Sequence, residues 1–240
     1  MNPPAPVRRR RFFSLGLGIV FIALISLGAS LFWAYHAAQK VPEFYQRAAA
    51  IPTEEQAEAG DRFEKQALEL RNETKRAGRW QIEFTEEEIN GWLAFTLPTK
   101  FPRLLPAQAQ QPRVAIVPGR LLFGCRYTQN GVETVFSLEM EPFLADETDI
   151  VAIRIRKARA GDLPVPLGQF TDKVTAAARK AGFVLRWGQT DGDPIAMIEL
   201  PTTDDGKPLV ELESLQLLSE RLVITGNTPM KTSESETTAD

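Results

Sequence analysis

The stretch FFSLGLGIVFIALISLGASLFWAY, residues 12–35, contains 24 consecutive residues without a charge, and four arginines directly precede it. As a helix rising about 1.5 Å per residue, it would be about 36 Å long, which is enough to cross the roughly 30 Å hydrocarbon core of a bilayer with some tilt. We therefore expect residues 12–35 to form a single transmembrane helix. The rest of the chain is interpreted outward from this anchor.

Charges beside the apolar stretch predict its orientation. The arginines lie within residues 1–11, whereas only Lys40 follows the stretch closely, so the positive-inside rule predicts a cytoplasmic basic tail and an extracytoplasmic bulk. The alternative is a cleaved signal peptide, whose apolar region is normally about 7–15 residues long. This stretch is longer, and its one small-x-small candidate, residues 28–30, lies inside it. We expect a retained signal-anchor and a single-pass protein of the cell membrane.

Composition excludes several classes of protein. Four of the 28 basic residues and none of the 31 acidic ones precede residue 12, which leaves 24 basic against 31 acidic residues, a formal charge of −7, outside the membrane. A nucleic-acid partner is therefore not expected. The single cysteine, Cys125, excludes an intramolecular disulfide, and it cannot form a catalytic dyad with the single histidine, His36, at the bilayer. No Walker loop, dinucleotide fingerprint or nucleophile elbow occurs, so we expect no enzyme, no cofactor and no metal site.

Residues 36–78 are expected to form a helical spacer. Thr53 and Gln56 have the spacing of a capping box, and the helix that follows should run to about Arg76 with a thin apolar stripe that includes Phe63. Two interpretations are open: a partner-binding or coiled-coil helix, or a solvated spacer that lays one face on the domain. The absence of a sustained heptad favours the spacer.

Residues 79–226 are expected to form an extracytoplasmic α+β domain. Trp80, Ile82 and Phe84 alternate as a short strand, and a capping box from Thr85 to Glu88 opens a helix that Pro98 is expected to end. From Arg113 the apolar period is two nearly throughout, with turns near residues 129–131 and 190–194, which predicts an antiparallel sheet. A second helix is expected over residues 167–181, and strands over 209–218 and 221–225. Residues 227–240 are polar and are expected to form a disordered tail.

Three groups of polar residues in this domain could be structural or functional. Asn90 lies off the apolar face of its helix, and we expect it to face solvent or to bond to neighbouring backbone. The basic residues of 154–159 could meet phospholipid head groups, but cross-strand pairing with the glutamates of 133–141 is the simpler interpretation. The aspartates at 191, 193, 204 and 205 could bind a hard cation, but they lack the spacing of an EF-hand, and turn chemistry explains them.

Three short motifs carry a resemblance to a known family. They are FTEEEINGWL at residues 84–93, DLPVP at 162–166 and ITG at 224–226, arranged after a basic tail and an anchor. This order resembles the YpmS-like family of membrane-anchored bacterial extracytoplasmic proteins. The long spacer helix departs from that pattern. The resemblance implies an α+β fold in which a curved antiparallel sheet carries two helices packed on one face, and it implies no catalytic residue.

Two function classes remain open. The first is a binding module for a lipid-like or other apolar ligand, held close to the membrane. The second is a non-catalytic structural or interaction subunit of a cell-envelope complex, with envelope proteins as partners. Cys125, in phase with the apolar side of its strand, is expected to be a buried hydrophobe. The residues that would bind an apolar ligand are Phe123, Phe136, Leu138, Ile153 and Phe170.

Overall fold

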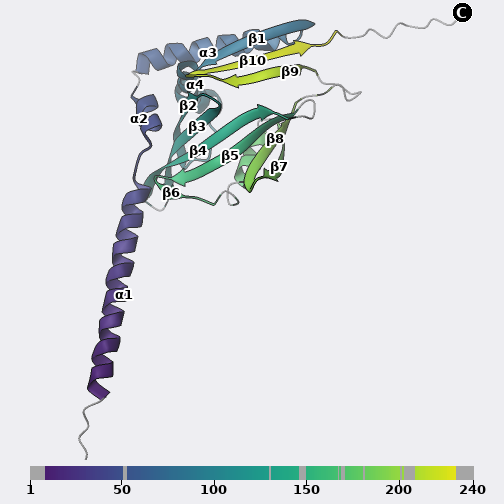
Figure 1. The fold of residues 1–240 in the computed structure, drawn as a ribbon. Helices are drawn as coiled ribbons and strands as arrows, with labels where there is room; N and C mark the ends of the chain where they lie inside the picture. Colours follow the sequence, from purple (N-terminus) through teal and green to yellow (C-terminus); the bar gives the residue numbers. More distant parts are fainter. Residues whose placement is uncertain are drawn as a thin grey trace, which may run out of the picture.

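The computed structural model describes residues 9–50, 53–129, 131–145, 150–166, 168, 171–180, 182–200, 202 and 209–230. They form an α+β fold with two antiparallel sheets and a few helices, which confirms the expected fold class at this level (Figure 1). The helices are α1 (Arg9–Ala38), α2 (Glu43–Ala49), α3 (Thr53–Glu73), α4 (Glu86–Gly91), the π-helical turn η1 (Trp92–Thr96), α5 (Leu97–Lys100) and α6 (Thr171–Lys180).

The larger sheet contains seven strands, of which six follow the order β2-β3-β4-β5-β8-β7 and the short β6 pairs with β5. Its strands are β2 (Ala109–Val117), β3 (Arg120–Gln129), β4 (Val132–Leu144), β5 (Ile150–Ala160), β6 (Leu163–Pro164), β7 (Val184–Thr190) and β8 (Asp193–Glu199). Asp191 and Gly192, at φ of 54° and 87°, form the two-residue turn between β7 and β8. Positive φ at both residues is the geometry of a type I′ hairpin.

Three further strands form a separate sheet, so the expectation of one sheet is corrected. Strands β1 (Gly78–Thr85), β10 (Arg221–Thr228) and β9 (Glu211–Leu217) are neighbours in the order β1-β10-β9. Trp80 of β1 is buried over Gly226, and its indole N–H donates to the Thr228 hydroxyl at 3.2 Å. Asn227 and Thr228 therefore belong to β10, not to the tail that was expected from residue 227; residues 231–240 lie outside the described residues.

Helix α1 covers the expected span and extends away from both sheets (Figure 1). Its apolar side chains from Ile22 to Tyr35 include eight large residues that are 51–68% exposed. Among the described residues, no helix is both long and apolar enough to cross a membrane. In α1 the structure describes side chains only from Ile22 onward.

The spacer lays one face on the domain, as expected. Phe63 of α3 packs against Phe84 and Trp92, with ring centroids 4.9 and 5.6 Å away. The backbones of α3 and α4 approach closely where Gly60 meets Gly91, and a Cβ on Gly91 would lie 2.5 Å from the Gly60 nitrogen. Close helix packing therefore requires glycine at position 91, whereas a Cβ on Gly60 would lie 3.0 Å from the Gly91 backbone.

The capping box at Thr85 is confirmed. The Glu88 amide donates to the Thr85 hydroxyl at 3.2 Å, and the Thr85 amide donates to a Glu88 carboxylate oxygen at 3.0 Å. We expected Pro98 to end this helix. The chain instead continues through η1 into α5, where Pro98 occupies the first turn, a position that needs no amide donor.

Candidate functional site

One face of the larger sheet carries the predicted ligand-binding residues. Phe123 of β3 pairs with Leu138 of β4, and Cys125 pairs with Phe136, so their side chains point to the same side. We call this the apolar face. It comprises Leu121, Phe123, Cys125, Phe136, Leu138, Met140, Ile153, Ile155 and Ala158.

The predicted site residues do not all lie together. Phe123, Phe136 and Leu138 form one contiguous group, whereas Ile153 of β5 pairs with Pro142, six residues along β4 from Phe136. At about 3.3 Å per residue, this separation is about 20 Å. Met140 and Ile155 fill the interval on the same face, and the period-two pattern had assigned both to the apolar side of their strands. Phe170 lies outside the described residues.

The apolar face is only partly covered. Phe123, Phe136, Leu138 and Ile153 are all half-buried, whereas Cys125, Ile155 and Ala158 on the same face are buried. The extensive helix contacts of this sheet are with its outer strands: α2, α4 and η1 contact β2, and α6 contacts β7. The second sheet contacts the central strand β4 through β9. Large apolar side chains in the middle of the sheet thus keep part of their surface accessible.

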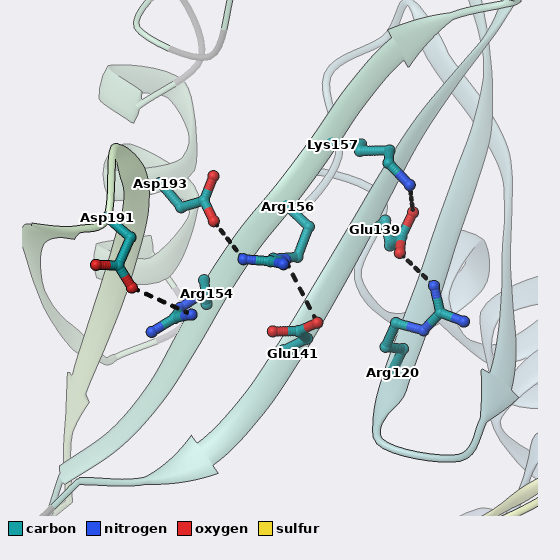
Figure 2. Close-up of polar contacts among 8 residues, drawn as sticks. All are labelled: Arg120, Glu139, Glu141, Arg154, Arg156, Lys157, Asp191 and Asp193. Atoms are coloured by element: carbon teal, nitrogen blue, oxygen red, sulfur yellow. Dashed lines mark hydrogen bonds and ion pairs between the residues drawn. The ribbon is translucent and has the colours of Figure 1, made fainter.

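The opposite face is charged and internally paired (Figure 2). Glu139 accepts from Arg120 at 2.5 Å and from Lys157 at 2.8 Å, and Arg156 pairs with Glu141 at 3.4 Å. Partial burial acts to raise the pKa of Glu139, but the hydrogen bonds from Lys157 and Arg120 outweigh it, so the pKa lies below its ordinary value. The expected cross-strand pairing is confirmed.

The aspartates of the β7–β8 turn have arginine partners. Asp193 pairs with Arg156 at 2.6 Å and Asp191 lies 4.0 Å from Arg154 (Figure 2). Asp204 and Asp205 lie outside the described residues. Within the described part of the chain, no group of three or more His, Cys, Asp or Glu side chains could hold a metal ion.

Asn90 is completely buried and binds the outer edge of β2, the first strand of the sheet. Its amide N–H₂ donates to the Val114 carbonyl at 2.9 Å, and its amide oxygen accepts from the Val114 N–H at 2.8 Å. Glu86 accepts from the Ile116 N–H at 2.7 Å; burial raises the pKa of Glu86 despite this bond. Asn90 is therefore a backbone partner of a distant strand, and the expectation that it faces solvent or bonds to neighbouring backbone is wrong.

The end of α1 is fixed to the sheet beside Phe136. The Ala37 carbonyl accepts from the Asp162 amide at 2.8 Å, and the Thr134 hydroxyl donates to the Ala38 carbonyl. Gly161, at φ 59°, lies so close that a Cβ there would be 2.3 Å from the Ala37 oxygen. Because Thr134 is two residues from Phe136 on β4, one end of the apolar face starts next to the end of α1.

Cys125 is a buried hydrophobe, as expected. Its side chain is 4% exposed, and burial raises the pKa of its thiol to about 11. A thiol that remains protonated at neutral pH is a poor nucleophile.

Sequence reasoning missed a pair of buried polar side chains, Gln56 and Arg113, that border a pocket beside β2. Gln56 was interpreted as part of a capping box and Arg113 as the start of a strand. Only the fold brings these two residues, 57 positions apart, to one pocket.

Comparison of the chain with protein-family models, with curated proteins and with solved structures gives no match.

Proposed function

We propose that this protein is a membrane-anchored, extracytoplasmic binding module for a lipid-like or other apolar ligand. The observation that carries the proposal is the partial exposure of Phe123, Phe136, Leu138 and Ile153 on one face of the sheet. Side chains of this size stabilise a fold by about 1.5–3 kcal/mol each when fully buried. Several large apolar side chains that stay half-buried on one face are typical of a surface that binds a ligand.

The anchor in this proposal is α1. Its sequence contains 24 uncharged residues, and its described side chains from Ile22 to Tyr35 are mostly apolar and exposed. Such a helix is unfavourable in water and favourable in a bilayer. The arginine tail then lies in the cytoplasm and the sheets lie outside.

The end of α1 lies close to the apolar face, which supports a short path for a ligand from the membrane to that face. The apolar face begins at Phe136, close to the carbonyls of Ala37 and Ala38 that end α1. From there it continues through Leu138 and Met140 toward Ile153. A ligand that leaves the bilayer beside α1 would meet apolar side chains first at Phe136.

Truncation of Leu138 tests the proposal. Leu138→Ala should lower the free energy of unfolding by less than about 2 kcal/mol, because its side chain is half-buried. The matched control is Ile116→Ala, 2% exposed in β2, which should cost about 2–5 kcal/mol. Lipid extracted from the purified full chain and identified by mass spectrometry should decrease in Leu138→Ala and persist in the control.

The competing proposal is a non-catalytic scaffold of a cell-envelope complex, in which the apolar face only packs within the protein. A full core penalty for Leu138→Ala, together with no lipid recovered from the unmodified protein, would reject ligand binding in favour of the scaffold.

A further inference from the structure

A pocket of about 440 Å³ lies away from the apolar face, between α3, the η1–α5 segment and the start of β2. Its lining is largely apolar and includes Leu93, Leu97, Phe101 and Leu105. The volume falls within the range of about 300–1,000 Å³ that small-molecule sites occupy.

Two buried donors border this pocket without an acceptor. Gln56 is 5% exposed, and its amide nitrogen Nε2 has no hydrogen-bond partner. Arg113 is 8% exposed, and its Nε also has none; its Nη1 donates only to the Pro112 carbonyl, at 2.8 Å. Among the described residues, no Asp or Glu lies within ion-pair distance of Arg113.

A buried guanidinium without a counterion is costly to the fold. Desolvation of an unpaired charge costs several kcal/mol, and buried charges in proteins are normally paired. Burial lowers the pKa of Arg113, which Tyr45 partly opposes, yet arginine keeps its charge in proteins. A ligand with a negative charge would therefore supply the counterion that the Arg113 guanidinium lacks.

The backbone around the pocket departs from regular geometry in two places. Gln111 has φ 50°, which is rare for a residue other than glycine, at an irregularity in the pairing of β2 with β3. The η1 segment, which supplies Leu93 and Phe95, is a π-helical turn. Bulges, positive φ and π turns all recur at functional sites.

We propose that this pocket binds an aliphatic carboxylate, whose head pairs with Arg113 and Gln56 and whose chain lies against Leu93, Leu97 and Phe101. The guanidinium matches a carboxylate in charge and planar geometry, and the glutamine amide adds a neutral donor. The site shares none of its residues with the apolar face and does not depend on the proposed function.

Equilibrium dialysis of radiolabelled hexanoate against the full chain in lipid nanodiscs tests the proposal, with empty nanodiscs subtracted. Two other probes separate head from chain: acetate carries the charge without the chain, and hexanamide carries the chain without the charge. We expect saturable binding of one hexanoate per chain, with acetate and hexanamide at least about tenfold weaker, because a hydrogen bond to a charged group contributes that much.

The variants are Arg113→Met and Gln56→Leu, which remove each donor and keep an apolar side chain of similar size. Both should weaken hexanoate binding at least about tenfold. Arg186→Met is the matched control, because Arg186 lies on β7, does not line the pocket, and pairs with Glu199 at 2.6 Å. It should bind hexanoate like the unmodified protein.

Three results would overturn the proposal: no saturable hexanoate binding, equal binding of acetate or hexanamide, or unchanged binding in the donor variants. Circular dichroism checks the fold of each variant. If Arg113→Met does not fold, Gln56→Leu decides, because it leaves the buried charge in place.

Discussion

Replacing Asn90 with alanine should remove the two hydrogen bonds that join this residue of α4 to Val114 of β2. The Asn90 side chain is 0% exposed and binds both the N–H and the carbonyl of Val114, itself buried. Alanine can replace neither bond, and α4 shields this edge of β2 from water. The variant therefore leaves two buried backbone groups without partners.

The expected magnitude follows from those two groups. An unsatisfied buried donor or acceptor costs about 1–3 kcal/mol, so Asn90→Ala should lower the free energy of unfolding by about 2–6 kcal/mol. Total stabilities are about 5–15 kcal/mol, so this loss is a large fraction. Asn72→Ala is the control, because Asn72 is exposed on α3 and its loss should change stability by less than about 0.5 kcal/mol.

Urea unfolding followed by tryptophan fluorescence measures the loss, and hydrogen exchange at the Val114 amide shows where it arises. We expect faster exchange at Val114 in Asn90→Ala and unchanged exchange in the control. A loss below about 1 kcal/mol at an unchanged m-value, or full protection of the Val114 amide, would refute the reasoning.

Three further predictions concern Cys125, Gly161 and topology. The unfolded Cys125 thiol ionises near pH 9.0 and the folded one near 11, so this group should leave the free energy of unfolding nearly unchanged below pH 9 and lower it by about 2 kcal/mol as the pH rises to 11. Cys125→Ala should lack that fall in pH-dependent unfolding. Gly161→Ala should cost at least about 2 kcal/mol and speed hydrogen exchange at the Asp162 amide, whereas Gly168→Ala, where a Cβ meets open space, should do neither. Protease added to intact spheroplasts should remove the domain after Lys40 and leave the arginine tail protected, and a protected domain would contradict the proposed orientation.

Local patterns predicted most of the strands and turns correctly. The alternation of Phe123, Cys125 and Tyr127 identified the inward side of β3, and the glycines at 131 and 192 identified turns at which the chain adopts positive φ. These features depend on residues close together in the chain, where period and turn chemistry operate.

The partition into two sheets depends on distant residues and could not be predicted. Trp80 of β1 pairs with Gly226, 146 residues later, and no local pattern specifies that partner. Pro98 was misjudged because a proline can end a helix or occupy the first turn of the next one. The pocket beside β2 was missed for the same reason as the second sheet. Gln56 and Arg113 come to line one pocket only when α3 packs over α4 and η1.

The most direct test of ligand binding uses a photo-crosslinking amino acid at two adjacent positions of β4. Leu138 lies on the apolar face, and Ser137, which pairs with Gly124 of β3 and Arg159 of β5, lies on the opposite face. The crosslinker at position 138 should yield lipid-like adducts of the full chain in its native membrane, identified by mass spectrometry, and the crosslinker at position 137 should yield none. Equal adducts at both positions, or none at position 138, would contradict the claim that the apolar face binds a lipid-like ligand.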